Sequence, residues 1–251
     1  TLSTRPAQAT DPLGAQRWPA ELQPLVDTLD RQFLALAQAR TAHTRLVSRA
    51  AHEFRTPLAA VRLHAQLMAR APAPDVQRTH QALLIASVDH MTRLVDQLLL
   101  LSELEWPQTD HAVSAIDVPS WIAPKQAVWQ SMAQTRDVRL EVSLPDDATL
   151  HGDPAGLLAL LDNVVHNALR HSPAGQTVTL QLRRTADGWE WRCIDHGPGM
   201  DAAQKATAGT GFAQSPHGSG LGLTIARRVT ERHGGQIHFE DTPGGGLTVR
   251  I

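Results

Sequence analysis

The strongest constraint on the fold is a run of apolar residues spaced alternately four and three positions apart. The residues on this spacing are Leu22, Val26, Leu29, Phe33, Leu36, Val47, Ala50, Phe54, Pro57 and Val61, then Leu84, Val88, Met91, Val95 and Leu98. The spacing predicts two long helices, each with one apolar stripe, that pack as a bundle. Prolines in residues 71–75 end the first helix and start the second. An interruption is expected near residues 40–44, where polar residues take stripe positions.

Two antiparallel helices with one stripe each cannot bury both stripes by themselves. The economical solution is a four-helix bundle formed by two copies of the hairpin. The sequence therefore predicts a homodimer.

His52 lies two positions after the stripe residue Ala50, so its imidazole is expected to point outward. Glu53 is its neighbour and Thr56 follows one turn later. An exposed imidazole flanked by a carboxylate and a hydroxyl suits a group that is chemically modified. The alternative is that His52 is one of the 13 histidines of the chain on a solvated helix face.

After about residue 107 the pattern changes to alternating helices and short strands. Antiparallel-looking strand pairs among them predict a two-layer α/β sandwich. Helices are expected near 119–134, 154–170 and 221–233, and strands near 138–142, 148–150, 178–182, 189–194, 237–239 and 247–251.

Asn163 and Asn167 are four residues apart, so they share one face of the expected 154–170 helix. Amide oxygens are neutral hard donors that suit Mg²⁺, which also keeps water and phosphate oxygens. Arg170 and His171 continue the end of this helix and could reach phosphate or ribose. The alternative is an ordinary polar helix face.

Asp195 comes directly after an expected strand and is followed by Gly197 and Gly199. A carboxylate at a strand end can accept a hydrogen bond from the adenine amino group, and the glycines let the backbone approach the base. The alternative is a plain turn, because Asp, Gly and Pro are common turn residues.

A third motif, Gly218-Ser219-Gly220-Leu221-Gly222, opens the expected 221–233 helix. Glycines at a helix N-terminus expose backbone N–H groups to phosphate. Residues 200–217 would then form a lid over a nucleoside triphosphate. We interpret residues 244–246, all glycine, as a plain hairpin turn.

These motifs, in this order, resemble the catalytic portion of the sensor histidine kinases of two-component systems over about residues 45–251. The phospho-acceptor box is matched at His52 to Pro57 and the asparagine box at Asn163 and Asn167. The residues that match the two glycine boxes are Asp195, Gly197, Gly199, Gly218, Gly220 and Gly222.

The resemblance implies a lead-in and HAMP-like linker helix over residues 1–42, and a dimerisation and phosphotransfer domain over 43–110. It implies a Bergerat-type ATP-binding domain over 111–251. The implied reaction is phosphorylation of His52 by ATP with Mg²⁺, with Glu53 holding the imidazole, followed by transfer to an aspartate of a response regulator. Thr56 would position a water that dephosphorylates the regulator, or simply cap the backbone before Pro57.

Composition excludes some other classes of protein. Charge is nearly balanced, with 23 basic and 25 acidic residues, and nothing indicates a nucleic-acid surface. No apolar run reaches the roughly 18 residues that span a bilayer. The chain begins with Thr1, and with the resemblance we expect the cytoplasmic portion of a bacterial inner-membrane protein whose only membrane link lies upstream. The spacing of His64 and His90 does not indicate zinc.

Two other functions remain open. A nucleotide-binding ATPase of the same superfamily would need the ATP motifs but not His52. A degenerate, weakly active kinase could serve as a dimeric scaffold that binds a regulator. The scaffold gains support from residues 209–214, which retain the single Phe212 and no arginine where the family usually carries several of both.

Overall fold

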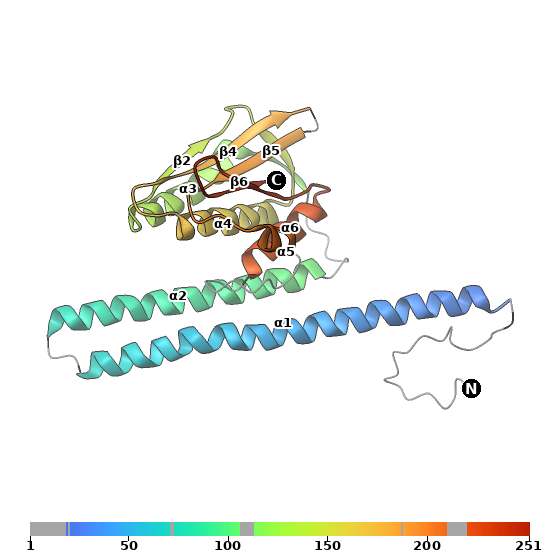
Figure 1. Cartoon of the computed structure of the whole chain (residues 1–251), viewed down its shortest axis with the longest axis horizontal. Helices are drawn as coiled ribbons and strands as arrows, with labels where there is room; N and C mark the ends of the chain where they lie inside the picture. Colours follow the sequence, from blue (N-terminus) through green and yellow to red (C-terminus); the bar gives the residue numbers. More distant parts are fainter. Residues whose placement is uncertain (1–18, 20, 71–72, 106–112, 187, 210–219) are drawn as a thin grey trace. The chain divides into compact units, whose positions relative to one another are not determined.

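The computed structural model describes residues 19, 21–70, 73–105, 113–186, 188–209 and 220–251 (Figure 1). They fall into two compact units, Thr1–Leu94 and Val95–Ile251. The elements in chain order are α1 (Gln23–Arg70), α2 (Pro74–Glu105), β1 (Ser114–Asp117), α3 (Val118–Gln134), β2 (Arg139–Ser143), β3 (Thr149–Gly152), α4 (Pro154–His171), β4 (Thr177–Thr185), β5 (Gly188–Ile194), α5 (Ala202–Thr207), α6 (Leu221–Arg232), β6 (His238–Asp241) and β7 (Leu247–Arg250).

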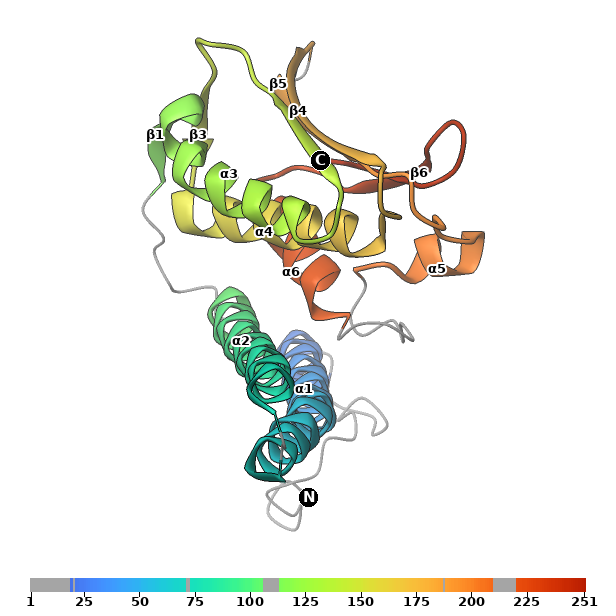
Figure 2. The same ribbon diagram turned by 90° about the vertical axis from the view of Figure 1, so that its left-hand side faces the viewer.

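The first unit is a helical hairpin in which α1 and α2 lie side by side (Figures 1 and 2). The helix α1 is continuous through residues 40–44, so the predicted interruption is wrong. Polar residues on the stripe weaken packing against a neighbour, but they leave the backbone hydrogen bonds intact. The preceding residues 35–40 are also mostly alanine, leucine, glutamine and arginine, which favour helix. The helix continues through Pro57 as well.

Part of the predicted apolar stripe is exposed in the single chain, and most of the rest is half-buried. Leu36 is 64% exposed and Val88 is 44% exposed. Val26, at 5% exposed, and Pro57 are buried. Among the described residues no helix is long and apolar enough to cross a membrane. The hairpin thus leaves an apolar surface that its own two helices do not cover.

The second unit contains a five-stranded sheet in the order β2-β4-β5-β7-β6, and a separate ribbon of β1 and β3. Strand β2 runs parallel to β4, and the other neighbours are antiparallel. The expectation of antiparallel pairs was therefore wrong for β2 and β4. The reason is that β3 and α4 intervene between these strands, so the chain crosses over before it rejoins the sheet. The short β1 was not predicted.

Helices α3, α4 and α6 cover one face of this sheet (Figure 2), which confirms the two-layer α/β sandwich. The buried apolar side chains between the layers include Ile122, Trp129, Leu160, Leu161, Val164, Val165, Val178, Leu180, Leu182, Cys193, Ile225, Val229 and Val249. Helices α3 and α4 are also joined by polar contacts. Trp129 Nε1 donates to Asp162 Oδ1 at 2.7 Å, and Lys125 forms an ion pair with the same carboxylate at 3.0 Å.

His233 joins the end of α6 to the start of α4. The backbone N–H of Asp153 donates to His233 Nε2 at 3.0 Å, and the ring Nδ1 lies 2.7 Å from the carbonyl oxygen of Val229. Because Nε2 accepts this hydrogen bond, the ring proton is on Nδ1, which donates a hydrogen bond to the carbonyl oxygen of Val229. Asp153 in turn caps α4 by accepting a hydrogen bond from Ala155 N–H. This histidine therefore holds together two helices that carry predicted site residues.

Candidate functional site

The Asp195 carboxylate is buried directly after β5, with 4% of the residue exposed. Its Oδ1 accepts hydrogen bonds from the backbone N–H groups of Gly197 at 2.9 Å and Leu247 at 3.0 Å. Burial raises the pKa of Asp195, although these two hydrogen bonds and the nearby rings of His171 and His196 oppose the rise. The side chain is therefore fixed in place by two segments that are far apart in the sequence.

The loop after Asp195 lies against the end of α4. A Cβ added at Gly197 would come within 2.6 Å of the carbonyl oxygen of His171. Gly199 has φ +72°, and a Cβ there would lie 3.0 Å from the carbonyl oxygen of Gly246. Both glycines are thus required by close contacts with the protein's own backbone. That they also let the backbone approach a base stays a prediction.

Gly246 is a site residue that sequence reasoning missed. It has φ +120°, and a Cβ at this position would overlap the backbone oxygen of Asp195. Gly244 and Gly245 have open space instead, with nothing within 4 Å of an added Cβ. The interpretation of 244–246 as a hairpin turn is confirmed, because these residues connect the antiparallel strands β6 and β7, but Gly246 in addition packs against the backbone of Asp195. No signal in three consecutive glycines distinguishes the third.

Asn163 lies beside the start of α6. Its Nδ2 donates to the carbonyl oxygen of Ala159 at 2.8 Å, which fixes the orientation of the amide. A Cβ added at Gly222 would lie 2.8 Å from Asn163 Oδ1. Asn167 is half-buried one turn further along α4. The structure therefore brings the asparagine motif and the second glycine motif into contact.

The end of α4 carries the other two predicted contacts. Arg170 is exposed and His171 is half-buried. The backbone of His171 touches the loop after Asp195, as described above. The helix thus links the asparagine motif at its centre to the first glycine motif at its C-terminus.

The helix α6 begins at Gly220, whose φ of +67° turns the chain into the helix. Thr224 Oγ1 donates back to the carbonyl oxygen of Gly220 at 3.0 Å. Leu221 is only 2% exposed, so its side chain anchors the turn in the core. Gly218 lies outside the described residues, as do residues 210–217 of the predicted lid.

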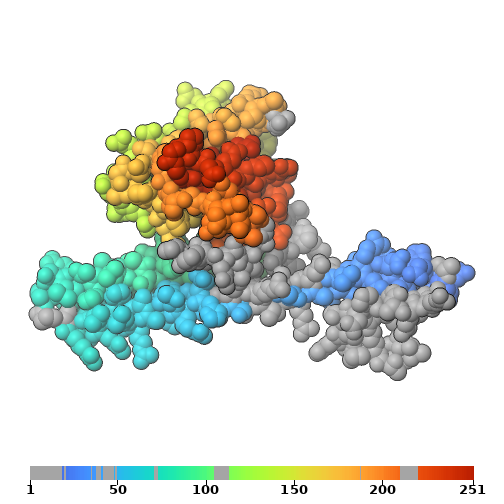
Figure 3. All heavy atoms as spheres, in the orientation of Figure 1, coloured from blue at the N-terminus to red at the C-terminus, as the bar shows by residue number. Residues whose placement is uncertain are grey.

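The short helix α5 occupies part of the segment predicted as a lid. Asp201 and Gln204 form a reciprocal cap at its start. Lys205 forms an ion pair with Asp241 at 2.6 Å, and Figure 3 shows this orange segment next to the red C-terminal strands. Arg227 of α6 donates to the carbonyl oxygen of Ala208 at 2.8 Å. Residues 201–208 are thus anchored to the body of the second unit.

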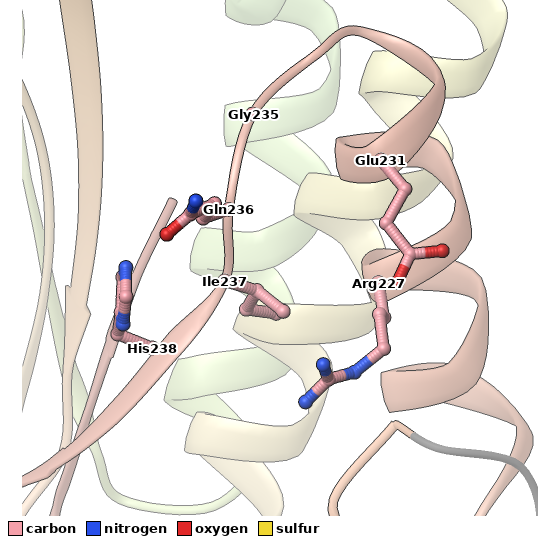
Figure 4. A pocket seen from close by; sticks show the side chains of 6 residues that line it. All are labelled: Arg227, Glu231, Gly235, Gln236, Ile237 and His238. Atoms are coloured by element: carbon pink, nitrogen blue, oxygen red, sulfur yellow. The ribbon is translucent and has the colours of Figure 1, made fainter.

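A groove of about 290 Å³ lies between α6 and the segment leading into β6. In Figure 4 Arg227 and Glu231 project from α6, with Gln236, Ile237 and His238 across from them. None of the predicted site residues lines it. We therefore do not assign this groove to the nucleotide.

The predicted phospho-acceptor residues lie on α1, in the first unit. His52 and Thr56 are exposed and Glu53 is half-buried, so the outward orientation predicted for His52 is confirmed. In the part of the chain that the structure describes, no three His, Cys, Asp or Glu side chains form a metal site. The amides of α4 remain the donors that suit a hard cation near the glycine motifs.

Two family models match this chain. Residues 42–105 match the His Kinase A (phospho-acceptor) domain. Residues 152–251 match the histidine kinase-, DNA gyrase B- and HSP90-like ATPase domain. The first match contains His52, and the second contains the asparagine and glycine motifs.

Whole-chain relatives point the same way. The sensor protein kinase PmrB of Pseudomonas aeruginosa is 34% identical over 264 residues, covering 100% of this chain and 54% of that protein. The sensor protein QseC of Escherichia coli is 32% identical over 259 residues, covering 100% and 56%. The chain thus spans about half the length of the curated relatives it matches.

Solved structures agree in fold. The histidine kinase AdeS of Acinetobacter baumannii has a TM-score of 0.61 at 20% identity, covering 80% of this chain and 96% of that one. The mycobacterial sensor histidine kinase MprB has a TM-score of 0.51 at 28% identity, covering 56% and 95%. With matches to both family models and to full-length sensors, the chain belongs to the sensor histidine kinase family.

Proposed function

We propose that this chain is the catalytic region of an ATP-dependent protein-histidine kinase that phosphorylates its own His52. The observation that carries the proposal is the meeting of three distant motifs in the second unit. Asn163 contacts Gly222, His171 contacts Gly197, and Leu247 holds Asp195. The exposed imidazole of His52, within the matched phospho-acceptor domain, supplies the acceptor.

In this proposal Asp195 recognises the adenine amino group. Both of its backbone hydrogen bonds fall on Oδ1, which leaves Oδ2 for a donor from the base. Gly197 and Gly199 let the base approach the backbone. Gly218, Gly220 and Gly222 offer N–H groups at the start of α6 to the phosphates, and Arg170 and His171 lie at the end of α4 within the same site.

Asn163 and Asn167 would hold Mg²⁺ together with phosphate oxygens and water. Their neutral amide oxygens fit a hard cation. The bond from Asn163 Nδ2 to Ala159 presents Oδ1 on the side of Gly222, and Oδ1 accepts a hydrogen bond from Gln97 Nε2 at 2.5 Å that a bound ion would replace. The ion would supply neutralisation of phosphate charge.

The chemistry at His52 is an in-line displacement. The neutral Nε2 forms a bond to the γ-phosphorus while the bond to the ADP oxygen breaks. Glu53 accepts a hydrogen bond from Nδ1–H, which keeps Nε2 unprotonated and stabilises the positive charge that develops on the ring. The enzyme contributes mainly position and charge neutralisation.

The phosphoryl group then passes to an aspartate of a response-regulator receiver domain. The exposed part of the apolar stripe of α1 and α2 supports a homodimer in which two hairpins form a four-helix bundle. Because the chain spans about half of its relatives, we place it on the cytoplasmic side of an inner-membrane sensor whose membrane part lies upstream. Thr56, exposed one turn after His52, would position a water for dephosphorylating the regulator.

The direct test is incorporation of label from γ-labelled ATP with Mg²⁺, followed by acid and alkali treatment. We expect acid-labile, alkali-stable phosphate on the wild-type chain. His52→Gln should abolish it while an ATP analogue still binds, and His90→Gln on α2 is the matched control that should keep the label. Label retained on the His52 variant would refute the acceptor assignment.

A second candidate is the weakly active scaffold that binds a regulator. The observation that favours it is the sequence of residues 209–214, which holds Phe212 and no arginine. A wild-type chain that binds the analogue and a receiver domain but takes up no label would establish this alternative.

A further inference from the structure

Two histidines of the hairpin face one another across α1 and α2. The Nδ1 atoms of His64 and His80 are 3.3 Å apart, and their ring centroids are 5.5 Å apart with the planes inclined by 31°. Both rings are half-buried. Sixteen residues separate them in the sequence, so no spacing motif predicts the pair. Each lies six residues from the turn, counted from Arg70 at the end of α1 and from Pro74 at the start of α2.

Packing does not explain this pair. The residues three and four positions away on the same helix faces are apolar around His64, including Val61 and Met68. Around His80 they are apolar except for Gln77. Two partly desolvated rings gain one hydrogen bond between them, which is a small return compared with two apolar side chains at the same places.

The separation of the two nitrogens matches a metal chelate. A tetrahedral ion with Zn–N bonds of about 2.0–2.1 Å holds two ligand nitrogens about 3.3–3.4 Å apart. The observed Nδ1 separation already equals this value. A small rotation of each ring would direct both lone pairs to a common point, with the protons on Nε2.

We propose that His64 and His80 form a two-imidazole site for a divalent transition-metal ion that bridges α1 and α2 near the turn. Imidazole without carboxylate selects borderline ions such as Zn²⁺ over Mg²⁺ or Ca²⁺. Two protein ligands leave the other positions to water, so the ion exchanges freely, unlike the ion in a closed four-ligand site. A bound ion fixes the register of the two helices at the base of the hairpin.

The test is titration of the full chain with Zn²⁺ alone, without nucleotide, by isothermal calorimetry at pH 7.5 in a non-chelating buffer. We expect one ion per chain at this site. His64→Ala and His80→Ala should each weaken binding by more than about tenfold. Loss of a residue that only hydrogen-bonds to a metal ligand lowers affinity about 10–100-fold, and loss of a ligand itself should cost at least as much. His90→Ala, which removes another histidine from α2, should leave the binding unchanged.

A further measurement secures the assignment. The helix melting temperature should rise with Zn²⁺ in the wild type and fall back when EDTA is added, because a ligand of the folded state stabilises it. If an alanine variant loses helicity, His64→Gln replaces it. Absence of binding by the wild type, or equal binding by wild type and both variants, overturns the proposal without touching the kinase assignment.

Discussion

The hairpin and the α/β unit differ in how much of their apolar surface a single chain buries. In the α/β unit the apolar side chains are buried between sheet and helices, and backbone contacts leave no room for side chains at Gly197 or Gly246. In the hairpin part of the apolar stripe is exposed, and so is His52, the proposed phospho-acceptor. One unit is complete in a single chain, whereas the other needs a second surface.

This difference separates what a substitution can do in each unit. In the α/β unit the glycines of the candidate site also make close backbone contacts within the fold. A substitution at one of them therefore alters both folding and ligand binding. In the hairpin the reactive side chain takes no part in packing, so chemistry and assembly can be changed independently. The following predictions are arranged to break or sharpen this contrast.

Gly246→Ala should have the largest effect. The new Cβ would overlap the backbone oxygen of Asp195 at a φ of +120°, where neither segment is a flexible side chain. We expect a loss of about 4 kcal/mol or more in the free energy of unfolding of the α/β unit. Urea unfolding followed by tryptophan fluorescence, to which the buried Trp129 and Trp191 of this unit contribute, measures it.

Gly244→Ala is the matched control for this prediction. It has φ +88° but open space around the added Cβ, so only the backbone strain of about 1 kcal/mol remains. Equal losses for the two variants would mean that the contact with Asp195 is unimportant.

Val88→Glu should break the dimer and leave the α/β unit folded. This predicted stripe residue is 44% exposed in one chain, and a carboxylate buried in a four-helix bundle without a partner loses about 3 kcal/mol. Analytical ultracentrifugation should show monomers, with the tryptophan fluorescence unchanged. Gln81→Glu, at an exposed position on the same helix, should stay dimeric. A dimeric Val88 variant would show that the stripe is not the interface.

The sequence predicted long periodic elements well and backbone proximity poorly. The helices α3, α4 and α6 were predicted to within one or two residues of their observed bounds. Apolar residues recur at helical spacing along the whole of such a helix, so the pattern ends where the helix ends. The parallel pairing of β2 with β4 and the role of Gly246 depend on how distant segments return to the sheet, which no local pattern records. The short α5 was missed although Asp201 and Gln204 form a recognisable cap.

The polar sites followed the same division. Asn163, Asn167 and Asp195 were placed correctly on a helix and at a strand end, because the spacing of polar residues on a helix and the end of a strand are local properties. The contacts that join them, such as that of His171 with Gly197, were not predictable. The pairing of His64 with His80 required the three-dimensional hairpin for the same reason.

Asp195→Asn should weaken ATP-analogue binding by about 10–100-fold, or about 1.4–2.7 kcal/mol, because the charged acceptor for the adenine amino group is lost. Asn retains an oxygen for the Gly197 and Leu247 N–H groups, so the fold should survive. Because burial raises the pKa of Asp195, wild-type binding should fall with decreasing pH sooner than for an ordinary aspartate. Calorimetric titration between pH 4 and 8 tests this, and a pH-dependent loss in the Asn variant would contradict it.

Glu190, on β5 just before Asp195, should show the opposite pH behaviour with the smallest effect. Burial alone would raise the pKa of Glu190, but hydrogen bonds and charge from Arg183 and Arg250 outweigh it and hold the pKa below its usual value. The Glu190 carboxylate therefore stabilises the fold at pH values above its pKa in the unfolded chain. This stabilisation is lost as the pH falls through its pKa in the folded chain. Asp195 has a raised pKa, so it binds its proton more tightly in the folded state. Lowering the pH from the folded pKa of Asp195 to its unfolded pKa therefore favours folding.

Glu190→Gln should accordingly lose about 1 kcal/mol in the free energy of unfolding at pH 7, as expected for a partly exposed ion pair. The loss should shrink toward pH 3, where the wild-type carboxyl is protonated as well. Glu141→Gln on β2 is the control, because Glu141 is exposed and should change stability by less than about 0.5 kcal/mol. Urea unfolding at both pH values decides the matter. A loss of stability that grows on acidification would mean that Arg183 and Arg250 do not lower the pKa of Glu190. The ion pairs of β5 would then contribute nothing to the stability of the α/β unit.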